Sequence, residues 1–200
     1  MNIQRAIDLA DAHKSKLTEE YISKLVGLSA PKVWHLLNNL CAQSDTYLEV
    51  GCFKGSTLLA ALYENPVYAV ALDNFSMAAT REEFYNNTKD ANFTFYEEDA
   101  FAFNVTKIEK PIKLYFYDGH HSGESHYSAI SHFSQCLADE FVYVCDDWDL
   151  TRMKTVTFTV LRDLGYEILE CYELAGKTNG TEEERKASWW GGIGIVKVRK

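Results

Sequence analysis

Five short apolar runs, separated by stretches with helical character, constrain most strongly how this chain can fold. The runs, which are rich in Val, Tyr, Phe and Leu, are TYLEV (46–50), VYAVAL (67–72), FTFYEE (93–98), IKLYFYD (112–118) and FVYVCD (141–146). Strands that are buried on both faces of a sheet have this continuous apolar pattern. Helices are expected between the runs, at 55–64, 77–90, 122–138 and 151–164. Alternating strands and helices predict a parallel sheet with helices on both faces.

The N-terminal part departs from this alternation. Residues 2–26 and 31–41 are expected to form two helices, and no apolar strand precedes them. In the second helix apolar residues recur at helical spacing, and Pro31 suits the first turn. We therefore expect residues 1–44 to form a helical cap on a domain that spans residues 45–200.

The C-terminal part departs from it as well. Residues 166–172 and 193–199 are strand-like, but the polar, glycine-containing segment 175–192 between them has no long apolar helix. A parallel connection needs a packed crossover, so we expect the last two strands to be antiparallel, with 175–192 as a surface loop.

Composition limits the partners that this chain can have. It has 200 residues and a formal net charge of −9, which suits one domain and opposes binding to a phosphate backbone. No run approaches the roughly 18 apolar residues of a membrane span, and the N-terminus has no signal-peptide core. We expect a cytoplasmic protein that binds neither membrane nor nucleic acid, and the aromatic-rich edges are compatible with a homodimer.

Acidic residues stand at or beside the end of every one of the five runs. They are Glu49, Asp73, Asp99, Asp118 and Asp146. Ligands of an open α/β sheet bind at the carboxyl ends of its strands. A single carboxylate there could be a helix cap, but five at successive strand ends predict one shared polar crevice.

The first run continues into E-V-G-C-F-K-G-S-T at residues 49–57, which is a strand end, a Gly-x-x-x-Gly turn and a helix start. Gly51 lets a ligand approach the backbone, and Gly55 allows a tight entry into the helix. An ordinary strand–turn–helix corner has the same pattern. The turn lacks both the G-x-G-x-x-G of dinucleotide binders and the Gly-Lys-Ser/Thr of a P-loop, which argues against a pyrophosphate ligand.

Two further acids fit a nucleoside. Asp73 can accept hydrogen bonds from both hydroxyls of a ribose, and Asp99 can accept one from an adenine amino group, with Phe101 packing on the ring. Each acid has the alternative role of a helix cap or turn residue.

Together these segments resemble the class I S-adenosylmethionine (SAM)-dependent methyltransferases over about residues 46–200. The resemblance implies a Rossmann-like, doubly wound, seven-stranded sheet that is mostly parallel with an antiparallel last strand. It also implies SAM as cofactor, with residues 49–57 around its methionine and ribose end. The residues that the resemblance assigns to the cofactor are Glu49, Gly51, Lys54, Gly55, Ser56, Asp73, Asn74, Asp99, Ala100, Phe101 and Asp118.

The last two runs carry the most specific signals, D-G-H-H from Asp118 and C-D-D-W around Asp146 and Asp147. Adjacent strand residues point to opposite faces, so these two acids can share a ligand only if the chain bends there. With Asp118 they would supply three hard oxygen ligands, which suit Mg²⁺ or a similar ion. The pattern is similar to the metal-dependent O-methyltransferases of the macrocin and novobiocin-sugar type.

That resemblance implies methylation of a hydroxyl on a small molecule, sugar-like or a diol or catechol. Asp118, His120 and His121 are the candidates for accepting the hydroxyl proton. Trp189 and Trp190 could close over a substrate, form a dimer contact or pack on the sheet edge.

Three alternatives stay open at this point. A nicotinamide-dependent oxidoreductase has a similar sheet, although the dinucleotide fingerprint is missing. A non-catalytic module could keep the methyltransferase fold. A methyltransferase could also work without metal, with the two adjacent Asp residues orienting a substrate or a helix.

Overall fold

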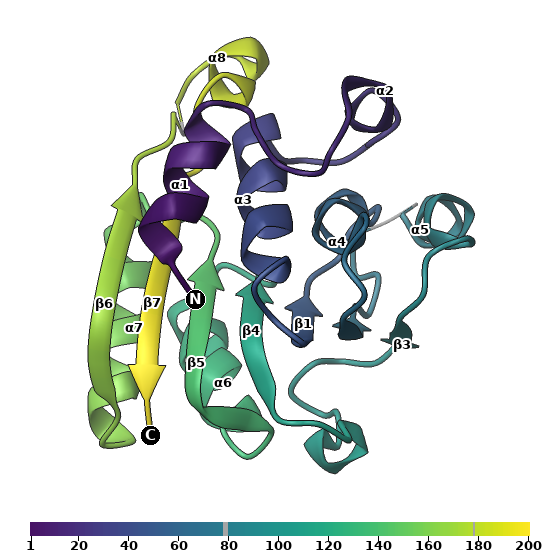
Figure 1. Ribbon diagram of the computed structural model, residues 1–200. Helices are drawn as coiled ribbons and strands as arrows, with labels where there is room; N and C mark the ends of the chain where they lie inside the picture. Colours follow the sequence, from purple (N-terminus) through teal and green to yellow (C-terminus); the bar gives the residue numbers. More distant parts are fainter. Residues whose placement is uncertain (78–79, 178) are drawn as a thin grey trace.

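The computed structural model describes residues 1–77, 80–177 and 179–200, which fold around a seven-stranded sheet (Figure 1). The strands cross the sheet in the order β3-β2-β1-β4-β5-β7-β6. β7 runs antiparallel to β5 and to β6, and the other neighbouring strands are parallel. The strands are β1 (Thr46–Val50), β2 (Tyr68–Leu72), β3 (Thr94–Tyr96), β4 (Ile112–Tyr117), β5 (Leu137–Cys145), β6 (Glu167–Leu174) and β7 (Ile193–Arg199). The predicted fold class, including the antiparallel last strand, is confirmed.

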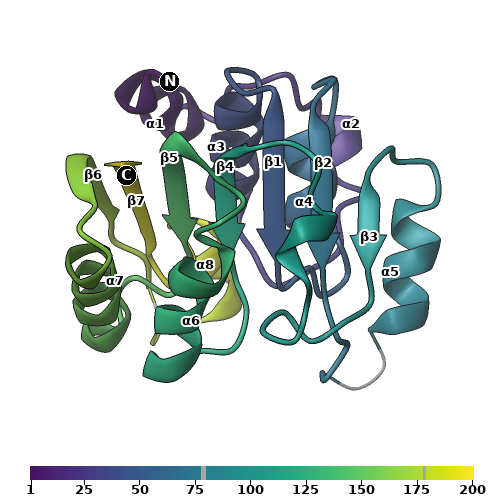
Figure 2. The same cartoon turned by 90° about the horizontal axis from the view of Figure 1, so that it is seen from below.

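Helices cover both faces of the sheet (Figure 2). The first face packs against α1 (Ile3–Asp11), α3 (Pro31–Cys41), α4 (Ser56–Leu62) and α5 (Arg81–Thr88), and the second against α6 (Gly123–Phe133) and α7 (Thr151–Asp163). Side chains alternate between the two cores, so Leu114 and Phe116 of β4 face the first and Tyr115 and Tyr117 face the second. Burial on both faces explains why the inner strands β1, β2 and β4 are continuous apolar runs.

The N-terminal helix expected at residues 2–26 is wrong in its extent, because the chain forms two helices there. The first, α1, ends at Asp11, and His13 follows with a φ of 52°, a left-handed conformation that stops a helix. The short α2 (Glu19–Ile22) then begins after Thr18, whose side chain accepts a hydrogen bond from the N–H of Tyr21. The second expected helix, 31–41, matches α3.

The strand expected at 141–146 begins earlier, at Leu137, and the helix expected at 122–138 ends at Phe133. Acidic Asp139 and Glu140 gave this part of the chain a polar pattern. They lie in β5 because the strand meets the basic end of the chain there: Glu140 pairs with Arg199 of β7, Lys197 Nζ lies 3.1 Å from a Glu140 oxygen, and the N–H of Lys200 donates to the oxygen of Asp139 at 2.9 Å.

The segment 175–192 is more structured than the expected surface loop. It contains α8 (Glu182–Lys186), which begins with a reciprocal hydrogen-bond pair between Thr181 and Glu184. Trp189 and Trp190 are 7% and 8% exposed and pack in the first core. Residue 178 lies outside the described residues, as do 78–79 of the helix expected at 77–90. Among the helices of the described residues, none is long and apolar enough to cross a membrane.

Candidate active site at the carboxyl edge of the sheet

The turn after β1 lies against the end of β4. Gly51 and Gly55 have φ values of 88° and 86°, in the left-handed region that glycine adopts without steric cost. A Cβ atom at Gly51 would lie 2.1 Å from the backbone oxygen of Asp118, so glycine is also required there for space. Two segments of the predicted crevice are therefore in direct contact.

Asp73 ties the end of β2 to the same turn. Its Oδ2 accepts hydrogen bonds from the backbone N–H groups of Cys52 and Phe53, both at 2.8 Å, and its Oδ1 accepts one from Phe75 at 2.7 Å. Both Cys52 and Phe53 lie inside the Gly-x-x-x-Gly turn. The acid predicted to hold a ribose therefore also fixes the shape of the turn, and Oδ1 keeps a lone pair for a ligand.

Asp99 lies beside the residue that follows Asp73. Its Oδ1 accepts hydrogen bonds from the backbone N–H groups of Phe101 and Ala102, which is the local turn that the sequence also allowed. Asn74 Nδ2 donates to Oδ2 of Asp99 at 3.4 Å. The polar ends of β2 and β3 are thus joined at one edge of the sheet.

Glu49 lies beneath the turn. Its side chain is fully buried, and its two oxygens accept hydrogen bonds from Tyr47 at 2.5 Å and from Thr57 at 2.7 Å. Burial raises the pKa of this carboxyl to about 8, although the two hydroxyl donors oppose the shift. Both oxygens are engaged inside the protein, so the predicted cofactor contact of Glu49 stays a prediction.

Lys54 and Ser56, two further predicted cofactor residues near the turn after β1, each contact another part of the chain. Lys54 Nζ lies 2.9 Å from an oxygen of Glu83, so α5 holds this lysine. Ser56 is buried, and a Cβ atom at Gly27 would lie 2.2 Å from its Oγ. The N-terminal cap therefore reaches the start of α4.

His121 lies between two of the predicted metal ligands. Its Nδ1 is 2.5 Å from Oδ2 of Asp147, and its Nε2 is 3.5 Å from Oδ1 of Asp118. Asp147 has a φ of 53°, so the chain bends at this residue as a shared site with Asp146 requires. Two of the three predicted metal ligands, Asp118 and Asp147, are therefore joined through His121, one of the predicted proton acceptors.

The charges of this cluster act strongly on one another. Hydrogen bonds to Asp118 and Asp147 raise the pKa of His121 to about 10, although its partial burial opposes the shift. Burial raises the pKa of Asp118, and burial with repulsion from Asp118 and Asp147 raises that of Asp146 well above its usual value. Three carboxyl groups thus crowd around one imidazole.

The donor set suits a hard divalent cation, because three carboxylates supply the oxygen ligands that Mg²⁺ prefers. As the side chains stand, no group of three or more His, Cys, Asp or Glu residues within the described ranges is arranged to hold an ion. His121 takes the position between Asp118 and Asp147 instead. The predicted metal site stays a prediction.

His120 and His126, the two histidines nearest to His121 in the sequence, differ in their surroundings. His120 is exposed, and its Nδ1 lies 3.4 Å from Ser125 Oγ at the start of α6. His126 is 1% exposed, its Nδ1 lies 3.5 Å from Cys145 Sγ, and burial lowers its pKa to about 4. His126 is thus a neutral packing residue of α6.

A feature that the sequence did not reveal is the close approach of the segment before β7 to this cluster. A Cβ atom at Gly191 would lie 2.1 Å from Oδ1 of Asp147. The W-W-G-G motif at 189–192 was the available signal, but nothing in it indicates which strand end it meets.

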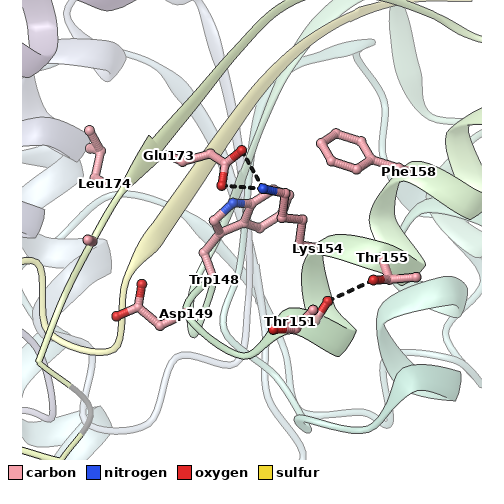
Figure 3. Close-up of a pocket in the computed structure, with 9 residues that line it drawn as sticks. Trp148, Asp149, Thr151, Lys154, Thr155, Phe158, Glu173 and Leu174 are labelled. Carbon is pink, nitrogen blue, oxygen red and sulfur yellow. Dashed lines mark hydrogen bonds and ion pairs between the residues drawn. The ribbon is translucent and has the colours of Figure 1, made fainter.

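A cleft of about 400 Å³ opens between α7 and the end of β6 (Figure 3). Trp148 and Phe158 line it together with Lys154 and Glu173, whose Nζ and Oε2 atoms form an ion pair at 2.5 Å. Cys145 and Glu173 pair with Gly194 from opposite sides, so β5 and β6 end at the same edge. Asp118, Asp146 and Asp147 do not line this cleft, and we assign it no part in the chemistry.

No protein-family model and no curated protein matches the sequence. Solved structures do resemble the chain. An O-methyltransferase from Bacillus cereus in complex with SAH gives a TM-score of 0.64 at 12% identity, over 99% of this chain and 90% of that one. Cofactor-bound Rv0187 from MTB gives a TM-score of 0.64 at 16% identity, over 99% of this chain and 89% of that one.

A Streptococcus mutans protein described as a SAM-dependent methyltransferase gives a TM-score of 0.61 at 11% identity over 88% of this chain, which spans 50% of the length of that protein. Likeness at such identities establishes the fold alone. The chain has the Rossmann-like fold of the SAM-dependent methyltransferases, with its acidic cluster at the carboxyl edge of the sheet.

Proposed function

We propose that this protein transfers a methyl group from SAM to a hydroxyl of a small molecule. The observation that carries the proposal is the contact between the turn after β1 and Asp118 at the end of β4. It joins a glycine turn suited to a nucleoside-bearing donor to a cluster of proton-accepting side chains. The similar fold of an O-methyltransferase from Bacillus cereus, which was solved in complex with SAH, supports the same chemistry.

The donor side of the site consists of the turn, Asp73 and Asp99. Asp73 holds the backbone of Cys52 and Phe53 in place and keeps a lone pair on Oδ1 for a ribose hydroxyl. Asn74 and Asp99 are hydrogen-bonded at the next strand end, where we place the adenine. The missing G-x-G-x-x-G turn and the acidic cluster argue against the alternative of a nicotinamide-dependent oxidoreductase.

The acceptor side consists of Asp118, His121 and Asp147. Methyl transfer forms a C–O bond and breaks the C–S bond of the donor sulfonium, so the sulfur keeps the bonding electron pair and the hydroxyl proton must leave. We assign that proton to Asp118, because its raised pKa makes it a better acceptor than an ordinary carboxylate. His121 holds its own proton and, in the absence of an ion, orients Asp118 and Asp147. Alignment of donor and hydroxyl supplies the main rate gain.

We include a divalent cation in this proposal, held by Asp118, Asp146 and Asp147. When bound, such an ion lowers the pKa of the acceptor hydroxyl. The excess of carboxylates over cations in the cluster supports it, and His121 would have to leave its place between Asp118 and Asp147. An acceptor with two neighbouring oxygens suits such a site, and the net charge of −9 argues against a nucleic-acid acceptor.

Binding of SAM by calorimetry, with NADH as the comparison ligand, tests the first part of the proposal. We expect SAM and SAH to bind in the micromolar range and to raise Tm, and NADH to do neither. A protein that binds NADH and not SAM would be assigned to the oxidoreductases. A protein that binds SAM but transfers no methyl group to a panel of diols, catechols and glycosides would fit the non-catalytic alternative.

A further inference from the structure

Gly191 lies directly against the carboxylate of Asp147. A Cβ atom at position 191 would lie 2.1 Å from Oδ1 of Asp147 and 3.3 Å from its Cγ, and the first distance is shorter than any that real side chains show. The other oxygen, Oδ2, is the one that lies 2.5 Å from Nδ1 of His121. The carboxylate is thus held between a glycine on one side and an imidazole on the other.

Space, and not backbone conformation, demands glycine at position 191. Gly192 has a φ of 91°, whereas Gly191 is not one of the described residues with a positive φ. Asp147 itself has a φ of 53°, a left-handed conformation that aspartate tolerates better than most residues. The close fit at position 191 is therefore a question of space on both sides of the contact.

Backbone hydrogen bonds fasten this glycine pair to the residues after Asp147. The N–H of Trp148 donates to the oxygen of Gly192 at 3.0 Å, and the N–H of Asp149 donates to the oxygen of Gly191 at 3.2 Å. A Cβ atom at Gly192 would lie 2.4 Å from Oδ1 of Asp149, so the two segments touch along their length.

Two buried tryptophans anchor the glycine pair from the other side. Trp189 and Trp190 pack in the core that α1 and α3 form on the first face of the sheet. Lys32 of α3 lies over the ring of Trp189 at 5.6 Å. Gly191 therefore cannot withdraw from Asp147 without moving a buried indole.

From these contacts we propose that Gly191 is a positioning residue for Asp147. It leaves room for Oδ1 and so directs Oδ2 toward His121 and the place where the acceptor hydroxyl reacts. An alanine at 191 would move the carboxylate by about 1 Å, and a misplacement of that size costs up to about 100-fold in rate. Its effect on turnover rests on the proposed methyl transfer, but its effect on stability rests on the contact alone.

A stability cycle tests the contact without any assay of activity. Gly191→Ala is expected to lower Tm by about 5 °C in the wild-type protein, because the new methyl group overlaps Oδ1 of Asp147. In the Asp147→Ala background, where that oxygen is gone, the same substitution is expected to lower Tm by less than about 1 °C. Equal losses in both backgrounds would overturn the proposal.

Steady-state kinetics test the positioning role. We expect Gly191→Ala to lower kcat about 100-fold and to leave KM for SAM within about twofold, and to cause no further loss of kcat in the Asp147→Ala background. Gly180→Ala is the matched control, because a Cβ atom there would meet Glu184 of α8 at 3.1 Å and not the acidic cluster.

We expect the Gly180→Ala variant to keep kcat within twofold of wild type. A wild-type kcat in Gly191→Ala, or an added loss in the Asp147→Ala background, would refute the positioning role. A wild-type protein that neither binds SAM nor methylates any acceptor would instead refute the proposed function, and the Tm cycle would still decide the contact.

Discussion

Nδ1 of His121 lies 2.5 Å from Oδ2 of Asp147, and this ion pair is the centre of the acidic cluster. The same imidazole reaches Asp118 through its other nitrogen. Hydrogen bonds to these two acids raise the pKa of His121 to about 10, so the imidazole carries a proton at neutral pH. A histidine that the sequence offered as a proton acceptor is thus a resident cation in this structure.

The raised pKa of His121 predicts a loss of stability in alkali. A group whose pKa is higher in the folded state stabilises the fold fully below its unfolded value of about 6.5, and this contribution is lost as the pH rises through about 10. The side chain is 40% exposed, so we expect solvent screening to limit the contribution to on the order of 1 kcal/mol. Urea unfolding from pH 6 to pH 10 should show a steeper loss for wild type than for His121→Gln. Parallel curves would mean that the pair does not contribute.

Asp73→Ala is expected to weaken cofactor binding and stability together, because it removes the acceptor of two backbone N–H groups in the Gly-x-x-x-Gly turn. Loss of hydrogen bonds to a charged group costs about 2 kcal/mol, and we expect at least a tenfold rise in the Kd of SAM. Calorimetry and urea unfolding measure the two effects. Asp45→Ala is the control, because Asp45 precedes β1 at the opposite edge and its ion pair with Lys113 is exposed. Equal effects of the two substitutions would contradict the role of Asp73.

Removal of Asp146 and Asp147 together tests the metal part of the proposal. The Asp146→Ala, Asp147→Ala double variant should lose metal-dependent turnover by about 100-fold or more, because the ion loses two of its three oxygen ligands. Its affinity for SAM should stay within about twofold, since both residues follow β5, which β4 separates from β1 in the sheet. Full wild-type turnover in excess chelator would exclude the ion from the mechanism. Asp118, oriented by His121, would then accept the hydroxyl proton without a metal.

The central part of the sheet could be predicted because β1, β2, β4 and β5 are largely buried on both faces, and each therefore has its own apolar run. The bounds of two strands also follow from such runs, because β1 and β7 begin and end where the sequence predicted. The early start of β5 could not be predicted, because Asp139 and Glu140 are polar for a reason that lies in β7, far along the chain. Local patterns do not record a partner strand.

The positions of the acidic residues of the site could also be predicted, but their hydrogen-bond partners could not. Acids at strand ends are visible in the sequence, and parallel strands bring their carboxyl ends to one edge. The hydrogen-bond partners of each carboxylate could not be read from the sequence. Glu49 bonds Tyr47 and Thr57, and Asp73 bonds the turn itself, because buried polar groups take whatever donors the fold brings to them.

The raised pKa of the buried Glu49 carboxyl predicts a further dependence of stability on pH. Its pKa of about 8 means that the folded protein holds this carboxyl protonated where the unfolded chain, with a value near 4.5, does not. An acid whose pKa is higher in the folded state stabilises the fold fully below its pKa in the unfolded chain. For Glu49 this contribution is lost as the pH rises through about 8. The loss should approach roughly 1.4 kcal/mol for each pH unit within that window.

Glu49→Gln should remove this dependence, because an amide is neutral at every pH. At pH 5 we expect it to unfold within about 1 kcal/mol of wild type, and to become the more stable protein as the pH approaches 8. Glu49→Ala is the contrasting variant, since it opens a cavity and leaves the hydroxyls of Tyr47 and Thr57 without an acceptor, at a cost of about 3 kcal/mol relative to Glu49→Gln at any pH. Urea unfolding between pH 5 and 8 measures all three proteins. A wild-type protein whose difference from Glu49→Gln stays constant across that range would show that Glu49 is ionised in the fold, and that the two hydroxyls outweigh its burial.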